Sequence, residues 1–285
     1  MGVHQTQILN EKINIFGGIQ KIIDEYNSGK SLKKINLISG IGCKTLSDII
    51  KQNGEIMIRN DSDKSRKYTI DENIFNELTE QSVYWIGFIM GDGCITKTGK
   101  EFAVLNVALN EKDLRHVEKF KEFMNTNKPI GYIEKYNTYS LTINSKQICD
   151  ILSNFDAINR KSYNATEKKN IPNELERHYW RGLIDADGHL RYDSKCDKWY
   201  IGLTGSFTLC SQFFDYVAKV IKLDSKTSVR KVSDNGSRVE FVGKLLPLSI
   251  IRNLYEDSTI YLERKFATFN KSVEYSIERG VFNNE

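Results

Sequence analysis

The stretch Trp85-Ile-Gly-Phe-Ile-Met-Gly-Asp-Gly93 is nearly repeated 95 positions later, as Trp180-Arg-Gly-Leu-Ile-Asp-Ala-Asp-Gly188. A tyrosine precedes each copy, Tyr84 in one and Tyr179 in the other. Each copy places a tryptophan-led apolar run before an Asp-Gly ending. Two such copies predict two similar halves that meet across a pseudo-two-fold axis, which would bring two carboxylates to one place.

Small residues recur four positions apart in both copies. Gly87 and Gly91 form one pair, and Gly182 and Ala186 form the other. On a helix, residues four apart lie on one face. We therefore expect each copy to be a helix whose small-residue strip lets the backbone of the other motif helix approach closely.

The end of each copy places an acid where a helix disfavours it. Gly93 and Gly188 resemble helix stops in the left-handed conformation, so Asp92 and Asp187 fall in the last helical turn. A carboxylate at the negative end of the helix dipole costs about 0.3–1 kcal/mol, and two neighbouring carboxylates also repel each other. A divalent cation bound by oxygen ligands is the natural compensation. The alternative is that each Asp-Gly is only a turn after a buried helix.

These residues resemble the motif of the LAGLIDADG homing endonucleases. Residues 183–188, Leu-Ile-Asp-Ala-Asp-Gly, reproduce that motif almost letter for letter, whereas Met90 replaces the first aspartate in the other copy. The resemblance extends over roughly residues 80 to 275. It implies an α+β fold: a single chain with two pseudo-symmetric αββαββα repeats, whose saddle-shaped antiparallel sheets sit on the DNA major groove.

The same resemblance implies a metal-dependent site. Asp92 and Asp187 match the acids that bind metal, with Gly91 and Ala186 beside them as further metal-site residues. The expected metal is Mg²⁺, with Mn²⁺ able to substitute, which activates water and stabilises the leaving oxygen. A second duplication, Asn-Arg-Lys and Glu-Arg-Lys, ends at two lysines that would flank this site, Lys161 and Lys265. Two exposed basic pairs are the alternative explanation of that duplication.

Hydrophobic periodicity and turn residues extend both repeats beyond their motif helices. In the first repeat we expect strands at 94–98 and 101–109, a helix at 111–125, strands at 130–136 and 138–143, and a helix at 145–155. In the second repeat we expect a strand pair within 189–206, a helix at 207–223, a hairpin at 226–243 and a helix at 247–255.

Charge is unevenly divided along the chain. The whole chain has 41 Lys or Arg and 37 Asp or Glu, and residues 1–70 contain 11 and 7 of these, so the remainder carries 30 of each. Within that neutral remainder, Asp234-Asn-Gly236 marks the turn of a hairpin with one apolar face. We expect its other face to contact DNA through Arg230, Lys231 and Arg238. A solvated sheet face is the alternative.

Residues 1–60 are expected to form a separate small all-α module. Helices are predicted at 19–29, at 32–38 with Ser31 as N-cap, and at 44–51 after the turn 40–42. The order resembles the helix-turn-helix of resolvases and small repressors, which implies a third helix facing a major groove. Its groove-facing residues would be Lys44, Thr45, Ser47 and Lys51. A helical cap that packs on the catalytic region is the alternative.

The complete domain assignment follows from these elements. We expect the module at 1–60, a polar linker at 61–79, the first repeat at 80–165 and the second repeat at 166–285. A further linker is expected near 162–173, where the repeats join.

Composition is typical of an intracellular protein in a reducing compartment, either cytoplasm or an organelle matrix. No run of 18 apolar residues is present to span a membrane, and the N-terminus does not resemble a signal peptide. Five scattered cysteines without a CxxC pair indicate neither a disulfide framework nor a zinc site.

The function we expect is that of a monomeric site-specific endonuclease, which hydrolyses one phosphodiester in each strand of a long asymmetric DNA target. Two alternatives use the same fold. One is a maturase that binds its host intron RNA, and the other is a transcription regulator without catalytic activity. Retention of both acids favours the nuclease over the regulator, because a protein that only binds nucleic acid does not need paired acids facing phosphate.

Overall fold

The computed structural model describes residues 3–28, 30–53, 68–98, 102–157, 167–221, 227–234 and 236–281. The chain divides into two compact units, Met1–Lys67 and Tyr68–Glu285. Each unit has its own apolar core, so we describe them separately.

The described part of the N-terminal unit consists of helices joined by short connections. Ser31 caps one helix by accepting a hydrogen bond from the backbone nitrogen of Lys34 at 3.3 Å, as the sequence predicts. Its core is built around Ile22, Ile35 and Leu46, which are fully buried. The helices are α1 (Val3–Phe16), α2 (Gly18–Asn27), α3 (Leu32–Ser39) and α4 (Cys43–Asn53).

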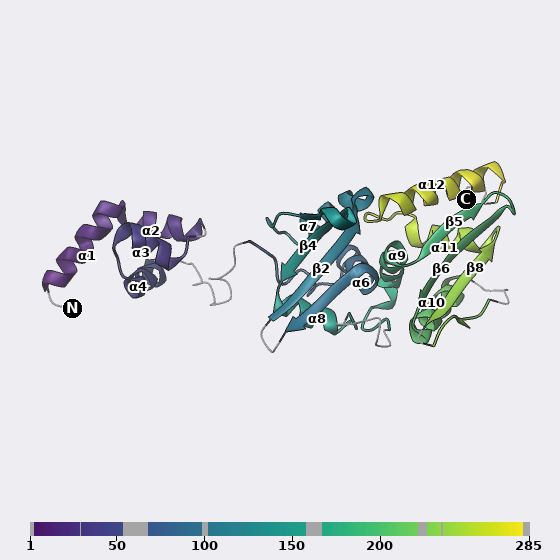
Figure 1. Ribbon diagram of the computed structural model, residues 1–285, viewed down its shortest axis with the longest axis horizontal. Coiled ribbons are helices and arrows are strands. Elements are labelled where there is room, and N and C mark those ends of the chain that lie inside the picture. The colour runs from purple at the N-terminus through teal and green to yellow at the C-terminus, as the bar shows by residue number, and fades with distance from the viewer. Residues whose placement is uncertain are drawn as a thin grey trace. The chain divides into compact units, whose positions relative to one another are not determined.

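The second unit contains the two predicted αββαββα repeats (Figure 1). The first consists of α6 (Glu80–Asp92), β1 (Gly93–Thr98), β2 (Phe102–Asn110), α7 (Leu114–Phe123), β3 (Gly131–Ile133), β4 (Thr138–Asn144) and α8 (Lys146–Ser153). The second consists of α9 (Glu176–Ala186), β5 (His189–Asp193), β6 (Lys198–Gly205), α10 (Phe207–Val220), β7 (Arg230–Lys231), β8 (Ser237–Gly243) and α11 (Leu246–Tyr255). A last helix, α12 (Glu263–Glu278), follows the second repeat.

Each repeat forms a four-stranded antiparallel sheet. The strand orders are β1-β2-β4-β3 and β5-β6-β8-β7, so the two sheets have equivalent topology. Alternate residues along β2, such as Leu105 and Val107, are fully buried under helices, and Val239 and Phe241 play the same part in β8. The opposite face of each sheet carries the more exposed side chains. Helices α6 and α9 lie side by side between the sheets (Figure 1).

The strand predicted at 130–136 is too long. Strand β3 ends at Ile133, and Glu134–Tyr136 form one turn of 3-10 helix instead. Asn137 then adopts φ 46°, a left-handed conformation that asparagine tolerates well. Residues 134–136 therefore form part of a tight turn that ends at Asn137, although their alternating pattern predicts a strand.

The predicted linker is also too long at its C-terminal end. Residues 68–79 belong to the second unit, where the Phe75 side chain is buried in the core. The hydroxyl of Thr126 donates to the backbone carbonyl of Thr69 at 2.6 Å. The linker interpretation rested on the polar run at 60–68, of which only Tyr68 lies within the described residues.

Helix α12 was not predicted from the sequence. Its buried face combines Phe269 with the polar residues Lys265, Ser272 and Ser276, so the apolar pattern that marks an amphipathic helix is interrupted. Arg264 at its start binds Asp113 of the first repeat, with Nε to Oδ2 at 3.1 Å. The helix therefore ties the end of the chain back to the other repeat.

All five cysteines lie in the described part of the chain and are free thiols, with Cys149 and Cys210 buried. Among the described residues, no helix has both the length and the apolar character needed to cross a bilayer.

Candidate active site

The two motif helices pack against each other through their glycines. A Cβ atom added at Gly87 would overlap the backbone carbonyl of Tyr179, and one added at Gly182 would overlap the carbonyl of Tyr84. The contact is reciprocal, as a pseudo-two-fold axis between the helices requires. At these two positions the backbones touch directly, and no larger residue fits without moving a helix.

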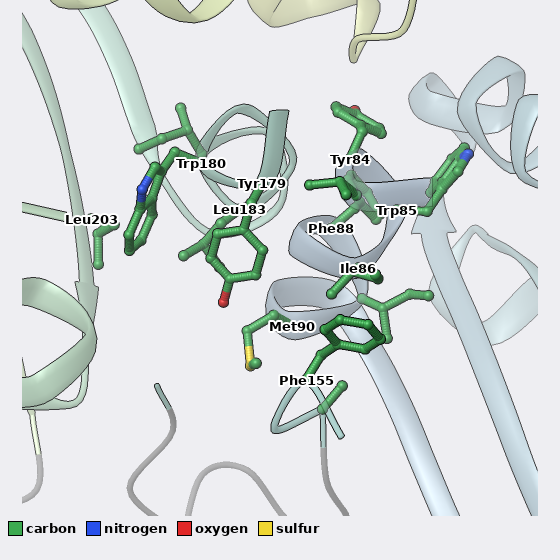
Figure 2. Packing of buried hydrophobic residues seen from close by; sticks show 14 of the residues in the cluster. Tyr84, Trp85, Ile86, Phe88, Met90, Phe155, Tyr179, Trp180, Leu183 and Leu203 are labelled. Atoms are coloured by element: carbon green, nitrogen blue, oxygen red, sulfur yellow. The ribbon is translucent and has the colours of Figure 1, made fainter. Parts of the chain in front are cut away.

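Each motif helix is also anchored in its own repeat by its tryptophan. The side chains of Trp85 and Trp180 extend in opposite directions from the helix pair (Figure 2). The Trp85 ring lies 4.8 Å from that of Phe120, and the Trp180 ring lies 5.2 Å from that of Phe213, measured between centroids. Because each helix is fixed on both sides, the positions of their C-terminal ends are fixed as well.

Those C-terminal ends bring the predicted acids together. Asp92 is the last residue of α6, and Asp187 directly follows α9. A Cβ added at Gly91 would overlap the methyl group of Ala186 and would lie 3.3 Å from the carboxyl carbon of Asp187. Asp187 is exposed and Asp92 half-buried, so this pair of acids is accessible from solvent.

Gly93 and Gly188 do not adopt the left-handed conformation that the sequence suggested. Gly93 has φ −76°, and neither glycine is among the residues with positive φ. The glycines are needed for space instead. A Cβ at Gly93 would lie 2.7 Å from the carbonyl oxygen of Ile89, and one at Gly188 would lie 2.8 Å from that of Ile184. The strand therefore leaves each helix end at a sharp bend that only glycine allows.

Lys265 lies in the first turn of α12, beside the two acids. Its ammonium donates to the backbone carbonyls of Ile184 and Gly188, the latter at 2.7 Å. Burial lowers the pKa of Lys265 to about 8, and the charges of Asp185, Asp92 and Asp187 oppose that shift. The lysine is thus held at the end of α9, close enough to both acids to be influenced by their charge.

Asp185 organises a buried hydrogen-bond network next to this site. Its carboxylate accepts from the hydroxyls of Tyr84 at 2.7 Å and Tyr255 at 2.6 Å, and from the backbone nitrogen of Leu262 at 2.7 Å. Burial raises the pKa of Asp185, while the charge of Lys265 and these three donors oppose the rise. The network joins both repeats to the residue that precedes α12, and so supports the position of Lys265.

Among the described residues, the first repeat has no carboxylate equivalent to that of Asp185. Met90 occupies the position equivalent to Asp185, and a thioether accepts hydrogen bonds only weakly. The hydroxyl of Tyr179, the counterpart of Tyr84, is buried without a hydrogen-bond partner among the described residues. The sequence shows this asymmetry as Met90 in one copy of the motif and Asp185 in the other. It does not show which groups surround Asp185.

The carboxylates of Asp92 and Asp187 suit a hard divalent cation whose remaining ligands come from water or substrate. Two carboxylates meet at the helix ends, and the described residues contain no group of three or more His, Cys, Asp or Glu that is arranged to hold a metal. Mg²⁺ is commonly bound by one or two carboxylates together with water and substrate phosphates. Asp92 and Asp187 therefore fit Mg²⁺ better than a metal that needs a cage made wholly of protein ligands.

The other predicted site residues lie in separate places. In the second sheet, Arg230 and Arg238 are exposed cross-strand partners on one face, whereas the neighbouring Lys231 points to the opposite face. Lys161, which the sequence pairs with Lys265, lies outside the described residues. The candidate residues of α4 are exposed or half-buried on the N-terminal unit, and they are Lys44, Thr45, Ser47 and Lys51.

Comparison with known proteins identifies the fold. No family model matches the chain, and no curated protein matches its sequence. Among solved structures, a point mutant of I-SmaMI is 13% identical and has a TM-score of 0.51, covering 72% of this chain and 93% of that one. The I-SmaMI LAGLIDADG homing endonuclease bound to cleaved DNA is 14% identical with a TM-score of 0.44, covering 70% and 89% of the two chains. The I-LtrWI LAGLIDADG homing endonuclease bound to target DNA is 12% identical with a TM-score of 0.45, covering 73% and 92%. This chain has the fold of the LAGLIDADG homing endonucleases.

Proposed function

We propose that this protein is a site-specific DNA endonuclease that cuts both strands of a long duplex target, acting as a monomer with Mg²⁺. One observation carries the proposal. The two motif acids, Asp92 and Asp187, converge at the ends of two tightly packed helices with Lys265 held beside them. The solved structures of similar fold include homing endonucleases bound to DNA targets, which supports duplex DNA as the substrate.

Asp92 and Asp187 would hold the metal through their carboxylates. When bound there, Mg²⁺ would activate a water molecule and stabilise the leaving oxygen. Lys265 has three N–H donors, of which two go to the carbonyls of Ile184 and Gly188. The third remains for a phosphate oxygen or a water, and with a pKa of about 8 the lysine is mostly charged at neutral pH.

Placing two carboxylates together at the negative ends of two helices is unfavourable for an empty site. The helix dipole alone costs each acid about 0.3–1 kcal/mol. A transcription regulator gains nothing from this arrangement, whereas a nuclease uses both acids to bind metal. The maturase remains an alternative, because RNA binding is compatible with intact acids.

The test is cleavage of defined DNA. Purified protein is incubated with duplex DNA that joins the two flanks of its own gene's insertion locus, with Mg²⁺ or with a chelator. We expect a double-strand break only with Mg²⁺. Asp92→Asn and Asp187→Asn should each abolish that break and retain binding, because asparagine keeps the shape and removes the ligand charge. Glu122→Gln, an exposed substitution on α7, is the matched control and should cut normally.

Full double-strand cleavage by either asparagine variant at saturating Mg²⁺ would refute this assignment of the site. A protein that binds intron RNA and leaves the joined duplex intact would instead support the maturase.

A further inference from the structure

The open faces of the two sheets differ in chemistry. We use open face for the side of each sheet opposite its buried apolar side chains. On the first sheet this face carries hydroxyl, amide, thiol and apolar groups, among them Thr96, Asn106, Ser140 and Thr142. None of its described residues is Lys, Arg, His, Asp or Glu.

The open face of the second sheet is charged. Arg191 on β5, Lys198 on β6, and Arg230 and Arg238 on β7 and β8 all belong to it. Glu240 and Asp193 are its only acids among the described residues, so it carries four Lys or Arg against two Asp or Glu.

Strand register shows that these differences occur at equivalent positions. The row Thr96, Val104, Asn144 of the first sheet corresponds to the row Arg191, Tyr200, Val242 of the second. By the same register Ser140 corresponds to Arg238, and Thr142 corresponds to Glu240. Two sheets of the same construction thus present neutral side chains in one case and charged ones in the other.

The charged side chains are held in place by their neighbours. The guanidinium of Arg191 lies 3.6 Å from the ring centroid of Tyr200. Nε of Arg238 donates to the Thr204 hydroxyl at 3.2 Å. An arginine that is already oriented loses less freedom when it binds a ligand.

One pair of arginines is unfavourable without a ligand. Arg230 and Arg238 are direct cross-strand partners, and like charges directly opposite each other destabilise a sheet. An anionic or electron-rich partner over this face relieves that repulsion. The same face also carries a hydrogen-bond acceptor, the carboxylate of Glu240. Its Oε1 lies 2.8 Å from Nε2 of His189.

We propose that the two sheets read the two halves of the DNA target differently, with the second sheet recognising G·C pairs and the first recognising an A·T-rich half. This rests on the proposed function, because it assumes that the open faces lie in the major groove. There, Arg pairs with the O6 and N7 atoms of guanine and carboxylates accept from the N4 amino group of cytosine. Asn pairs with adenine, and the methyl groups of Thr and Ala contact that of thymine.

The experiment is selection of bound duplexes from a random DNA library. The full-length protein is used with a chelator present, so that duplexes are bound without being cut. Two double variants are compared with the parent. Arg191→Thr with Arg238→Ser gives the second sheet the residues of the first at equivalent positions, and Thr96→Ala with Ser140→Ala is the matched control. All four positions are solvent-accessible, and thermal unfolding checks that both variants stay folded.

We expect the parent to select duplexes with G·C pairs concentrated in one half. The arginine variant should lose selectivity in that half alone, with discrimination falling on the order of ten-fold at each affected pair. Its binding should also depend less on salt, because fewer counterions are released. The control variant, Thr96→Ala with Ser140→Ala, should change base selectivity only in the A·T-rich half and leave the salt dependence of binding unaltered. If the arginine variant does not fold, Arg191→Gln alone removes one charge and keeps a polar side chain.

Equal base composition in the two halves, or a G·C preference that survives loss of the arginines, would overturn this inference. In that case cleavage of the selected duplexes with Mg²⁺ would leave the proposed function standing. If no duplex is enriched, the proposed function and this inference fail together.

Discussion

Tyr84 and Tyr179 occupy the same place in the two sequence repeats, but their surroundings differ. Tyr84 donates to the buried Asp185 carboxylate, so its oxygen is left to accept from Nε2 of His116, which lies 3.0 Å away. The chain of hydrogen bonds therefore runs from His116 through Tyr84 to Asp185 and keeps the proton of the histidine on Nε2. Tyr179 has no such partner among the described residues.

This difference predicts opposite effects of the same substitution. Tyr84→Phe should lower the free energy of unfolding by about 1–3 kcal/mol, because it leaves a buried carboxylate short of a donor. Tyr179→Phe should be neutral or stabilising, since it removes a buried hydroxyl that has no hydrogen-bond partner among the described residues. Urea unfolding of the parent and both variants measures this. Equal destabilisation by the two substitutions would show that the two tyrosines have equivalent environments.

His116 should make the fold sensitive to acid. Burial, with the nearby charges of Lys119 and Arg264, lowers the pKa of His116 from 6.5 to about 3. Because the folded-state pKa lies below the unfolded value, the stability from neutral His116 is complete above pH 6.5 and is lost as the pH falls toward 3. At about 1.4 kcal/mol per pH unit, the loss at pH 5 is about 2 kcal/mol.

The His116 contribution is measured by comparison with His116→Gln, which keeps an N–H donor for Tyr84 and does not titrate. Urea unfolding at pH 7 and pH 5 should show a larger loss of stability for the parent than for the variant. Identical losses would mean that His116 does not remain neutral in the folded protein.

The acids Asp92 and Asp187 were identifiable from the sequence because a motif of nine residues occurs twice. The partners of Asp185 were not identifiable. Tyr84, Tyr255 and Leu262 are separated from it by 101, 70 and 77 residues, and no local pattern links residues so far apart. Contacts of this kind depend on how the helices pack, which periodicity does not specify.

At the level of single elements, the interface between α6 and α9 depends on two glycines. Because even a Cβ would overlap a backbone carbonyl at Gly87 or Gly182, alanine alone should force the helices apart. We expect Gly87→Ala and Gly182→Ala each to lower the free energy of unfolding by about 1–3 kcal/mol, despite the better helix propensity of alanine. Cleavage should fall as well, because the acids at the helix ends would move.

Gly131→Ala is the matched control for these substitutions. A Cβ there would meet its nearest neighbour, the Ser140 hydroxyl, at an ordinary 3.6 Å. Thermal unfolding compares the three variants, and cleavage by the variants at 87 and 182 is compared with that of the parent. Variants at 87 and 182 that match Gly131→Ala in stability and the parent in cleavage would show that the helices do not pack through these glycines.

Element type was predictable wherever a repeat or a clear period was present. The order αββαββα is what the family resemblance implies, turn residues and apolar spacing locate its elements, and the structure has this order in both repeats. The predictions failed where one residue type can serve two structural roles. Glycine at 93 and 188 provides space beside Ile89 and Ile184, not a left-handed helix end. Helix α12 was not predicted because lysine and serine interrupt the apolar residues of its buried face.

At the scale of the whole molecule, the two compact units have different charge. All 11 Lys or Arg and 7 Asp or Glu of residues 1–70 lie within residues 1–67, so the second unit has 30 of each and no formal net charge. The side chains of Ile22, Ile23 and Leu46 are buried, and Ile22 and Leu46 belong to the core of the N-terminal unit itself.

Deleting residues 1–67 should therefore separate DNA affinity from cleavage. Truncation before Tyr68 keeps the hydrogen bonds that Thr69 makes with Thr126 and Asn127, which a deletion through residue 70 would remove. We expect the truncated protein to fold and to cut the same site with weaker affinity. The salt dependence of binding should be shallower, because fewer phosphates are neutralised. A single appended unit reaches only one flank, so the footprint on DNA should shorten at one end. Binding at several salt concentrations and footprinting of both forms test this. If affinity, salt dependence and footprint are all unchanged, the candidate residues of α4 do not contact DNA, and the N-terminal unit serves another purpose.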